Sequence, residues 1–224
     1  MKFHLVFHAS EADLLEYWRQ VNPTPPVTFE TISWVAQQCQ GLADGLAKIH
    51  RFQTAPFQTN KFTTSFGRHG GIKPESVLWF QDPNSAHGGT LQITDFGHAE
   101  PSIFKSDIRK PGSRAAFSPS YRPPECDIPG GLIGVSSDIW SLGCLYLEFI
   151  SWLLGSWNLV QEFQKKRLTV DPLYANIQTD TLFLIEKVRE TGNLRVLIKP
   201  AVTSVNKPAI NLVYSYSHKF TINF

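Results

Sequence analysis

Cysteine is scarce in this sequence of 224 residues, and the spacing of the few that occur is uninformative. The 3 cysteines are Cys39, Cys126 and Cys144, which lie far apart and form no CxxC pair. An odd number at this spacing predicts neither a zinc site nor a disulfide framework. We interpret all of them as buried free thiols in a reducing compartment.

An excess of charge is also missing. The chain has 21 Lys and Arg against 19 Asp and Glu, which leaves a formal net charge of +2. The longest basic run, Lys165–Arg167, is too short to form a polybasic patch. This balance gives no electrostatic reason to bind nucleic acid or an anionic membrane, so we expect neither as a partner.

Long hydrophobic runs are absent as well. No stretch approaches the roughly 18 consecutive apolar residues of a membrane-spanning helix. The N-terminal segment MKFHLVFHASEADLL has an apolar stretch too short for a signal peptide. We therefore expect an intracellular protein, cytoplasmic or nuclear, without a signal peptide or a transmembrane segment.

Apolar residues are nevertheless abundant. They make up 42% of the chain against 18% charged residues, which is enough for a sizeable core and excludes a wholly disordered chain. The length fits one domain, or one and a half.

The clearest predicted helix spans residues 31–50. Apolar side chains recur there every three or four positions, and Thr28 or Thr31 is a plausible N-cap. A shorter helix is expected over residues 11–20, with Ser10 as its N-cap.

Further helices are predicted in the second half of the chain. Residues 138–152 are apolar nearly all round, which favours a helix at the centre of a domain. Two short helices are expected at about 157–166 and 180–191.

One small β-hairpin is predicted between the second and third helices. Val77–Phe80 and Thr90–Thr94 are β-like runs, and the turn-rich residues 82–89 join them. Residues 52–68 are polar and predict a loop. The fold class is therefore α+β, mostly α.

Four stretches occur in an order that resembles the large, C-terminal lobe of a eukaryotic protein kinase. His69–Ser76 (HGGIKPES) resembles the catalytic loop H-R-D-x-K-x-x-N, and Asp95–Gly97 matches the D-F-G triplet. Tyr121–Glu125 (YRPPE) resembles the A-P-E end of the activation segment. Asp138–Gly143 (DIWSLG) resembles the start of the central helix of that lobe. The residues in these stretches look most like those of fungal members with serine/threonine-type kinase domains.

The resemblance covers about residues 3–165, and residues 166–224 diverge. It implies that Leu5–Phe7 is the last strand of the small lobe and that His8 and Ala9 form the hinge. Nothing ahead of residue 3 supplies a glycine-rich loop or a phosphate-holding lysine, so we expect the small lobe to be essentially missing.

The resemblance also implies ATP-dependent phosphoryl transfer to Ser or Thr, with ATP and Mg²⁺ as cofactors. Asp95 would ligate the metal, Ser76 stands at the place of the second ligand, and Lys73 would contact the transferring phosphate. The residues implied on the nucleotide side are His8, Ala9, Lys73, Ser76 and Asp95.

Other matched positions are implied to be structural or to bind the substrate. His69 would lie against Phe96 of the triplet that ends at Gly97. Glu125 would stabilise the lobe through an ion pair, and Asp138 would have a structural role. The ledge for a substrate peptide would consist of Tyr121, Arg122, Pro123 and Pro124.

The departures from the family pattern concern the chemistry itself. Gly71 stands where the family has its catalytic base, and glycine cannot accept a proton. Gly70 replaces an arginine that often binds a phosphorylated activation loop. Glu75 is near in sequence but is expected to point elsewhere. General-base catalysis typically contributes ~10²–10⁴-fold, so a large rate defect is expected.

Three functions remain open from the sequence. The favoured one is a truncated, catalytically impaired, pseudokinase-like module that binds a protein partner or substrate. The alternatives are an active serine/threonine kinase with an unusual catalytic loop and an unstable truncated gene product. The sequence does not indicate the oligomeric state for any of the three.

Two further segments are open to more than one interpretation. The tail Val213–Phe224 has strand-like alternation and could be a disordered end, a pairing strand or a product of altered splicing. Serines of the activation segment could be phosphorylated, although a solvated loop serine is the favoured interpretation for each; they are Ser102, Ser106, Ser113, Ser118 and Ser120.

Overall fold

The computed structural model describes residues 7–51, 53–54, 63–64, 66–82, 88–102, 118–172 and 177–204. Several predictions fall outside these ranges: the first two residues of the expected strand Leu5–Phe7, Ser106, Ser113 and the alternating tail Val213–Phe224.

Helix α2 (Phe29–His50) confirms the clearest sequence prediction. Thr28 has an extended backbone, and its hydroxyl accepts a hydrogen bond from the backbone N–H of Thr31 at 3.3 Å, as an N-cap does. The helix ends at His50, with Arg51 as its C-cap. Its buried face comprises Trp34, Val35, Leu42 and Leu46.

The first helical segment is shorter than predicted. Residues 12–13 form a strand, β1 (Ala12–Asp13), followed by α1 (Leu14–Glu16) and the π-helical turn η1 (Tyr17–Val21). The prediction of a helix from residue 11 with Ser10 as its cap is therefore wrong. The backbone N–H of Glu11 donates to the carbonyl of Trp79 at 3.2 Å, so the chain pairs with β5 here, and Asp13 caps α1 instead.

The predicted β-hairpin is present. β5 (Val77–Phe80) and β6 (Thr90–Ile93) pair antiparallel, with Val77 opposite Ile93 and Phe80 opposite Thr90. β1 pairs with the other edge of β5, which makes a three-stranded sheet in the order β1-β5-β6. Alternate residues of β5 are buried because one face of this sheet lies on the core.

Helix α3 (Val135–Arg167) contains both helices predicted at 138–152 and 157–166. They meet at a break where Gly155 and Ser156 leave helical geometry, and Ser156 has a left-handed φ of 66°. The backbone N–H of Trp157 donates to the carbonyl of Pro23 at 2.9 Å, so the break lies against the segment that follows η1.

α3 is long and apolar enough to cross a membrane by length and composition, but half of that window is buried inside the structure, as in a core helix. Its first turn and middle also carry the buried acidic residues Asp138 and Glu148.

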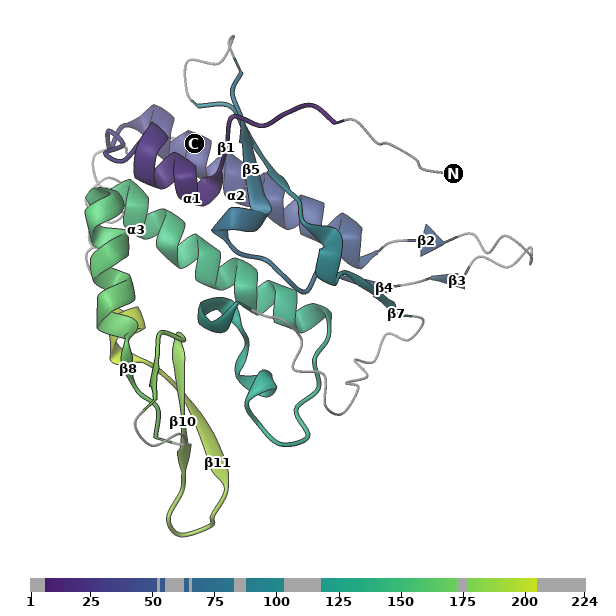
Figure 1. Ribbon diagram of the computed structural model, residues 1–224, viewed down its shortest axis with the longest axis vertical. Coiled ribbons are helices and arrows are strands. Elements are labelled where there is room, and N and C mark those ends of the chain that lie inside the picture. The colour runs from purple at the N-terminus through teal and green to yellow at the C-terminus, as the bar shows by residue number, and fades with distance from the viewer. Residues whose placement is uncertain are drawn as a thin grey trace, which may run out of the picture.

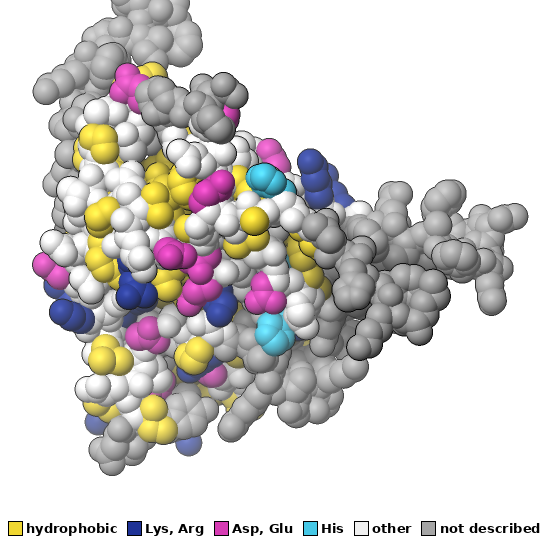
Figure 2. Space-filling model, turned by 45° about the horizontal axis from the view of Figure 1, so that its top comes forward, with side chains coloured by type: hydrophobic (Ala, Val, Ile, Leu, Met, Phe, Trp, Pro, Cys, Tyr) yellow, Lys and Arg dark blue, Asp and Glu magenta, His cyan; other side chains and the backbone are white. Residues whose placement is uncertain are grey.

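The face shown in Figure 2 carries acidic and basic side chains with hydrophobic ones between them, as the small net charge suggests.

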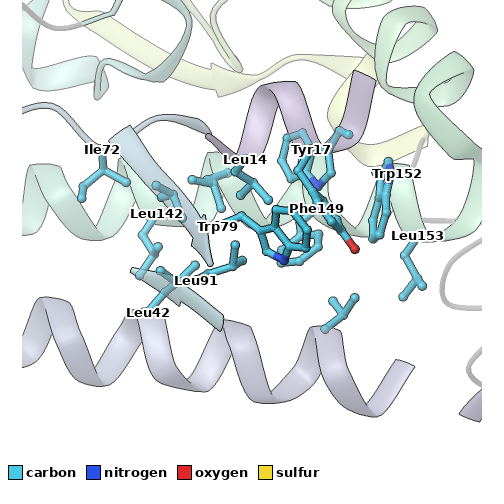
Figure 3. Close-up of a cluster of buried hydrophobic side chains, with 14 of the residues drawn as sticks. Leu14, Tyr17, Leu42, Ile72, Trp79, Leu91, Leu142, Phe149, Trp152 and Leu153 are labelled. Atoms are coloured by element: carbon cyan, nitrogen blue, oxygen red, sulfur yellow. The ribbon is translucent and has the colours of Figure 1, made fainter. Parts of the chain in front are cut away.

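A cluster of aromatic side chains joins α3 to η1, α2 and β5 (Figure 3). The rings of Tyr17 and Trp79 have centroids 4.8 Å apart, and those of Phe149 and Trp152 are 5.6 Å apart. The indole N–H of Trp152 donates to the carbonyl of Asn22 at 2.7 Å. The polar end of Trp152 is thus satisfied while its ring packs, whereas the buried indole N–H of Trp18, in the same cluster, has no hydrogen-bond partner among the described residues.

Residues 200–204 are helical, but the helix predicted at 180–191 is wrong. Residues there form a hairpin of β10 (Phe183–Lys187) and β11 (Leu194–Ile198), which extends from the end of α3 in Figure 1. Phe183 and Ile185 are buried on one face, a period of two that fits a strand. Gly192, with φ at 71°, closes the turn.

Three further pairs of short strands lie within the described residues. β4 (Phe66–Arg68) pairs with β7 (Glu100–Ser102), and β2 (Gln53–Thr54) pairs with β3 (Thr63–Thr64), so the loop predicted over 52–68 is wrong in part. β8 (Thr169–Val170) pairs with β9 (Gln178–Thr179). Helices with small sheets agree with the predicted α+β class.

Candidate functional site at the His69–Ser76 loop

The loop His69–Ser76 is attached to the first turn of α3 by one buried carboxylate. Asp138 is 1% exposed. Its Oδ2 accepts the backbone N–H of His69 at 2.7 Å, and its Oδ1 accepts that of Gly70 at 2.8 Å. Nε2 of His50, the last residue of α2, donates to Oδ2 at 2.9 Å. Asp138 therefore holds the loop, α2 and α3 in one arrangement.

His69 is the second fixed point of the loop. Its imidazole is fully buried, Nε2 donates to the carbonyl of Thr94 at 2.8 Å, and Nδ1 accepts the backbone N–H of Gly71 at 3.2 Å. This pattern requires a neutral ring with its proton on Nε2. The ring centroid lies 5.1 Å from that of Phe96, so the structure places the two side chains together.

The apolar side chain of the loop points into the core. Ile72 is buried and belongs to the cluster drawn in Figure 3, where it lies beside Leu142 of α3. The loop thus has polar and apolar attachments to the same helix.

The two glycines of the loop differ in the room around them. Gly70 has a left-handed φ of 77°, and a Cβ there would lie 2.9 Å from the carbonyl oxygen of His98. A Cβ on Gly71 would lie 3.5 Å from Cδ2 of His98, which is ordinary van der Waals contact. Position 71 can therefore accept a side chain, whereas position 70 cannot without strain.

Ser76 does not fit the metal-ligand role that the resemblance implied. Its hydroxyl donates to the carbonyl of Lys73 at 2.9 Å and accepts the backbone N–H of Lys73 at 3.0 Å. The residue is fully buried, and its hydroxyl closes the turn η2 (Pro74–Ser76). Lys73 itself is partly exposed, and within the described residues its ammonium group makes no ion pair.

Asp95 fits the role of an oxygen ligand. It is exposed, has a left-handed φ of 63°, and begins the turn η3 (Phe96–His98). Its Oδ1 would lie 3.3 Å from a Cβ on Gly97, so glycine leaves room for the carboxylate. Mg²⁺ prefers such oxygen ligands. In the described part of the chain, no three His, Cys, Asp or Glu residues gather closely enough to hold a metal ion.

The D-F-G segment and the loop lie side by side. The backbone N–H of Thr94, just before Asp95, donates to the carbonyl of Ser76 at 2.9 Å. The expected hinge residues lie at the other end of the sheet. His8 and Ala9 are exposed, and the ring of His8 stacks on Phe80 of β5 with centroids 5.9 Å apart.

The expected substrate ledge is partly buried. Tyr121, in the turn η4 (Pro119–Tyr121), donates its hydroxyl to Glu148, and Pro123 is buried too. Burial, reinforced by the charge of Glu148, raises the pKa of Tyr121. Tyr121 is therefore a core residue and not a peptide-contacting surface.

Neighbouring polar groups of this segment are also engaged. Arg122 donates from Nε to both carboxylate oxygens of Asp127, at 2.9 and 3.1 Å, and from Nη1 to the carbonyl of Pro119 at 3.0 Å. The hydroxyl of Ser120 donates to Asp180, so the interpretation of Ser120 as a solvated loop serine is wrong.

The ion pair predicted for Glu125 is not found among the described residues, which contain a different buried pair. Within the described residues Glu125, in the turn η5 (Pro124–Cys126), makes no ion pair. Arg167 instead pairs with Glu148 at 2.8 Å, and both side chains are 1% exposed. The available signal was a single acid inside the apolar stretch 138–152, which needs a partner when buried.

The free thiols are less uniform than expected. Cys144 is buried, whereas Cys39 and Cys126 are half-buried. Burial raises the pKa of Cys39 to about 11 and that of Cys144 to about 12, so neither is a ready thiolate at neutral pH.

No protein-family model matches the chain. Among curated proteins, it is 29% identical over 182 residues to human cyclin-dependent kinase-like 4, an alignment that covers 80% of this chain and 38% of that protein. It is 25% identical over 154 residues to cyclin-dependent kinase 2 of Caenorhabditis elegans, with 67% of this chain and 34% of that protein covered. It is 32% identical over 101 residues to CBL-interacting protein kinase 20 of rice, with 43% and 21% covered.

These relatives are all protein kinases. They support the protein kinase superfamily for this chain. The chain spans about a fifth to two fifths of the length of these relatives.

Proposed function

We propose that this chain is a protein-kinase-type lobe of serine/threonine ancestry that works mainly by binding, with strongly impaired phosphoryl transfer. One observation carries the proposal: Asp138 holds the catalytic-type loop in place through His69 and Gly70, yet the next residue, Gly71, has no side chain. The proposal is thus supported by a loop that is held in an ordered conformation but lacks the side chain of the general base.

The groups that remain favour binding over chemistry. The carboxylate of Asp95 is exposed and can take a cation, while the ammonium of Lys73 is partly exposed on the neighbouring loop. Ser76 is closed off by its bonds to Lys73, so the second metal ligand is missing as well as the base. Loss of a general base alone slows such a reaction by ~10²–10⁴-fold.

The partner proposed for this lobe is a protein, either a docking partner or a substrate. Its surface for that partner would include the partly exposed Arg122 and Pro124. Likeness to fungal members and an intracellular location remain predictions of the sequence.

Nucleotide binding by the full chain tests the proposal. We expect ATP with Mg²⁺ to raise the thermal unfolding temperature, because a ligand that binds only the folded state stabilises it by RT ln(1 + [L]/Kd). The shift should vanish in Asp95→Ala. It should persist in Asp44→Ala, which removes an exposed carboxylate in the middle of α2.

A transfer assay separates impaired from full activity. With radiolabelled ATP and casein, the wild type should be at least ~10²-fold slower than Gly71→Asp, since the carboxylate would restore the general base. A wild type as fast as Gly71→Asp would contradict the impairment. A shift that survives Asp95→Ala would contradict the binding site.

A further inference from the structure

Two imidazoles lie next to the side-chain space that Gly71 leaves empty. A Cβ on Gly71 would lie 3.8 Å from Nδ1 of His69 and 3.5 Å from Cδ2 of His98. His69 cannot take up a proton without breaking a hydrogen bond, because it is buried and both ring nitrogens are in use. His98 is exposed, so its ring can exchange protons with solvent.

The backbone brings His98 to this place. η3 turns the chain directly after Asp95, and the N–H of Ala99 donates to the carbonyl of Phe96 at 2.9 Å, which closes the turn. The close approach also needs glycine at position 70, because a Cβ there would lie only 2.9 Å from the carbonyl oxygen of His98. Gly70 therefore makes room for the backbone of His98, and the ring of His98 lies within van der Waals distance of a Cβ at position 71.

We propose that His98 serves as the general base in place of the side chain missing at Gly71, accepting the hydroxyl proton of a Ser or Thr in a protein substrate. This proposal rests on the proposed function, because it concerns the slow transfer that the impaired loop retains. Imidazole is the side chain best suited to this step near neutral pH.

The step balances with ATP as the phosphoryl donor. The substrate oxygen gives its proton to a ring nitrogen of His98 and forms a bond to the γ-phosphorus. The bond between the γ-phosphorus and the bridging oxygen breaks, and ADP leaves with that electron pair. The imidazolium then returns its proton to water. The loop itself contributes the charged residues Lys73 and Glu75. The charged residues next to it are Arg68, Asp95 and Asp138, and the imidazole of His50 is hydrogen-bonded to Asp138.

The placement of His98 is tested without any activity measurement. In ¹⁵N-histidine-labelled chain, Gly71→Asp should move the ring signals of His98, because the new carboxylate would lie beside the ring. Gly41→Asp adds the same charge to α2 at a point with no other atom within 4 Å, and should leave these signals in place. His98→Gln assigns the signals. Unmoved signals in Gly71→Asp would overturn the proposal.

The role of His98 is tested by transfer to casein together with the Mg–ATP thermal shift. His98→Ala should lower the slow residual rate of the wild type several-fold, by less than the ~10²–10⁴-fold that a fully effective general base contributes, and should leave the thermal shift unchanged. Adding Gly71→Asp to His98→Ala should restore transfer, and Lys48→Ala, an exposed residue of α2, should change nothing.

Each contrary result has a defined meaning. A normal rate in His98→Ala overturns the role of His98. A nucleotide-dependent thermal shift with no transfer at any pH overturns it too, but leaves the proposed function standing. If Mg–ATP does not raise the unfolding temperature of the wild type, the proposed function is contradicted. The NMR comparison then still tests where His98 lies.

Discussion

Replacing Asp138 by alanine is expected to release the His69–Ser76 loop from α3. The substitution removes the acceptor of three hydrogen bonds, two of them from the buried backbone N–H groups of His69 and Gly70. Each buried donor left without a partner costs ~1–3 kcal/mol, so the two together cost ~2–6 kcal/mol. That is a large part of the ~5–15 kcal/mol that stabilises an ordinary domain.

Two measurements on Asp138→Ala test this prediction. Urea denaturation, followed by tryptophan fluorescence, gives the change in the free energy of unfolding. Amide hydrogen exchange should show lost protection at His69 and Gly70 before the rest of α3 opens. Ser136→Ala, one exposed position in the same turn, is the matched control and should change stability by less than ~0.5 kcal/mol.

The reasoning would be refuted by a small loss in Asp138→Ala with normal protection of both amides. Such a result would mean that Ile72, through its apolar contact with the core, is enough to hold the loop. Asp138→Asn separates the contributions further. Its amide keeps one acceptor oxygen, so we expect a loss smaller than that of alanine.

The remaining predictions use the same urea assay. Gly71→Ala should be nearly neutral, whereas Gly70→Ala should cost ~1–2 kcal/mol because of its left-handed backbone. Arg167→Met should cost ~3–5 kcal/mol, since it leaves a buried carboxylate unpaired, while the exposed Arg195→Met should cost little. Burial lowers the pKa of Lys199 to about 8, so the unfolded chain holds the extra proton above that pH. The wild type should therefore gain stability relative to Lys199→Met between pH 8 and about 10.4, the lysine value in unfolded chains.

The periodic elements were predictable because their signals are local. α2, the β5–β6 hairpin and the two parts of α3 each have an apolar pattern long enough to show its period. The order of the kinase-like motifs could likewise be recognised from the sequence. The relatives are all protein kinases, in agreement with the resemblance that these motifs indicated.

The errors arose where a distant partner decides the local conformation. Residues 11–13 run beside β5, so strand pairing replaces the helix that Ser10 suggested. Phe183 and Ile185 carry too short a pattern to tell a strand from a helix, and the pairing of β10 with β11 decides for the strand. The buried pair of Arg167 and Glu148, 19 residues apart in α3, likewise has no local signal that names the partner.

The sequence by itself determined which side chains are present: a glycine at position 71, a serine at position 76 and an intact Asp95. Only the tertiary structure decided what those positions can do. The carboxylate of Asp138 and the hydroxyl of Ser76 form hydrogen bonds that hold the loop. His98 lies next to the space beside Gly71. These outcomes depend on contacts between segments distant in the chain, and no local pattern of residues encodes them.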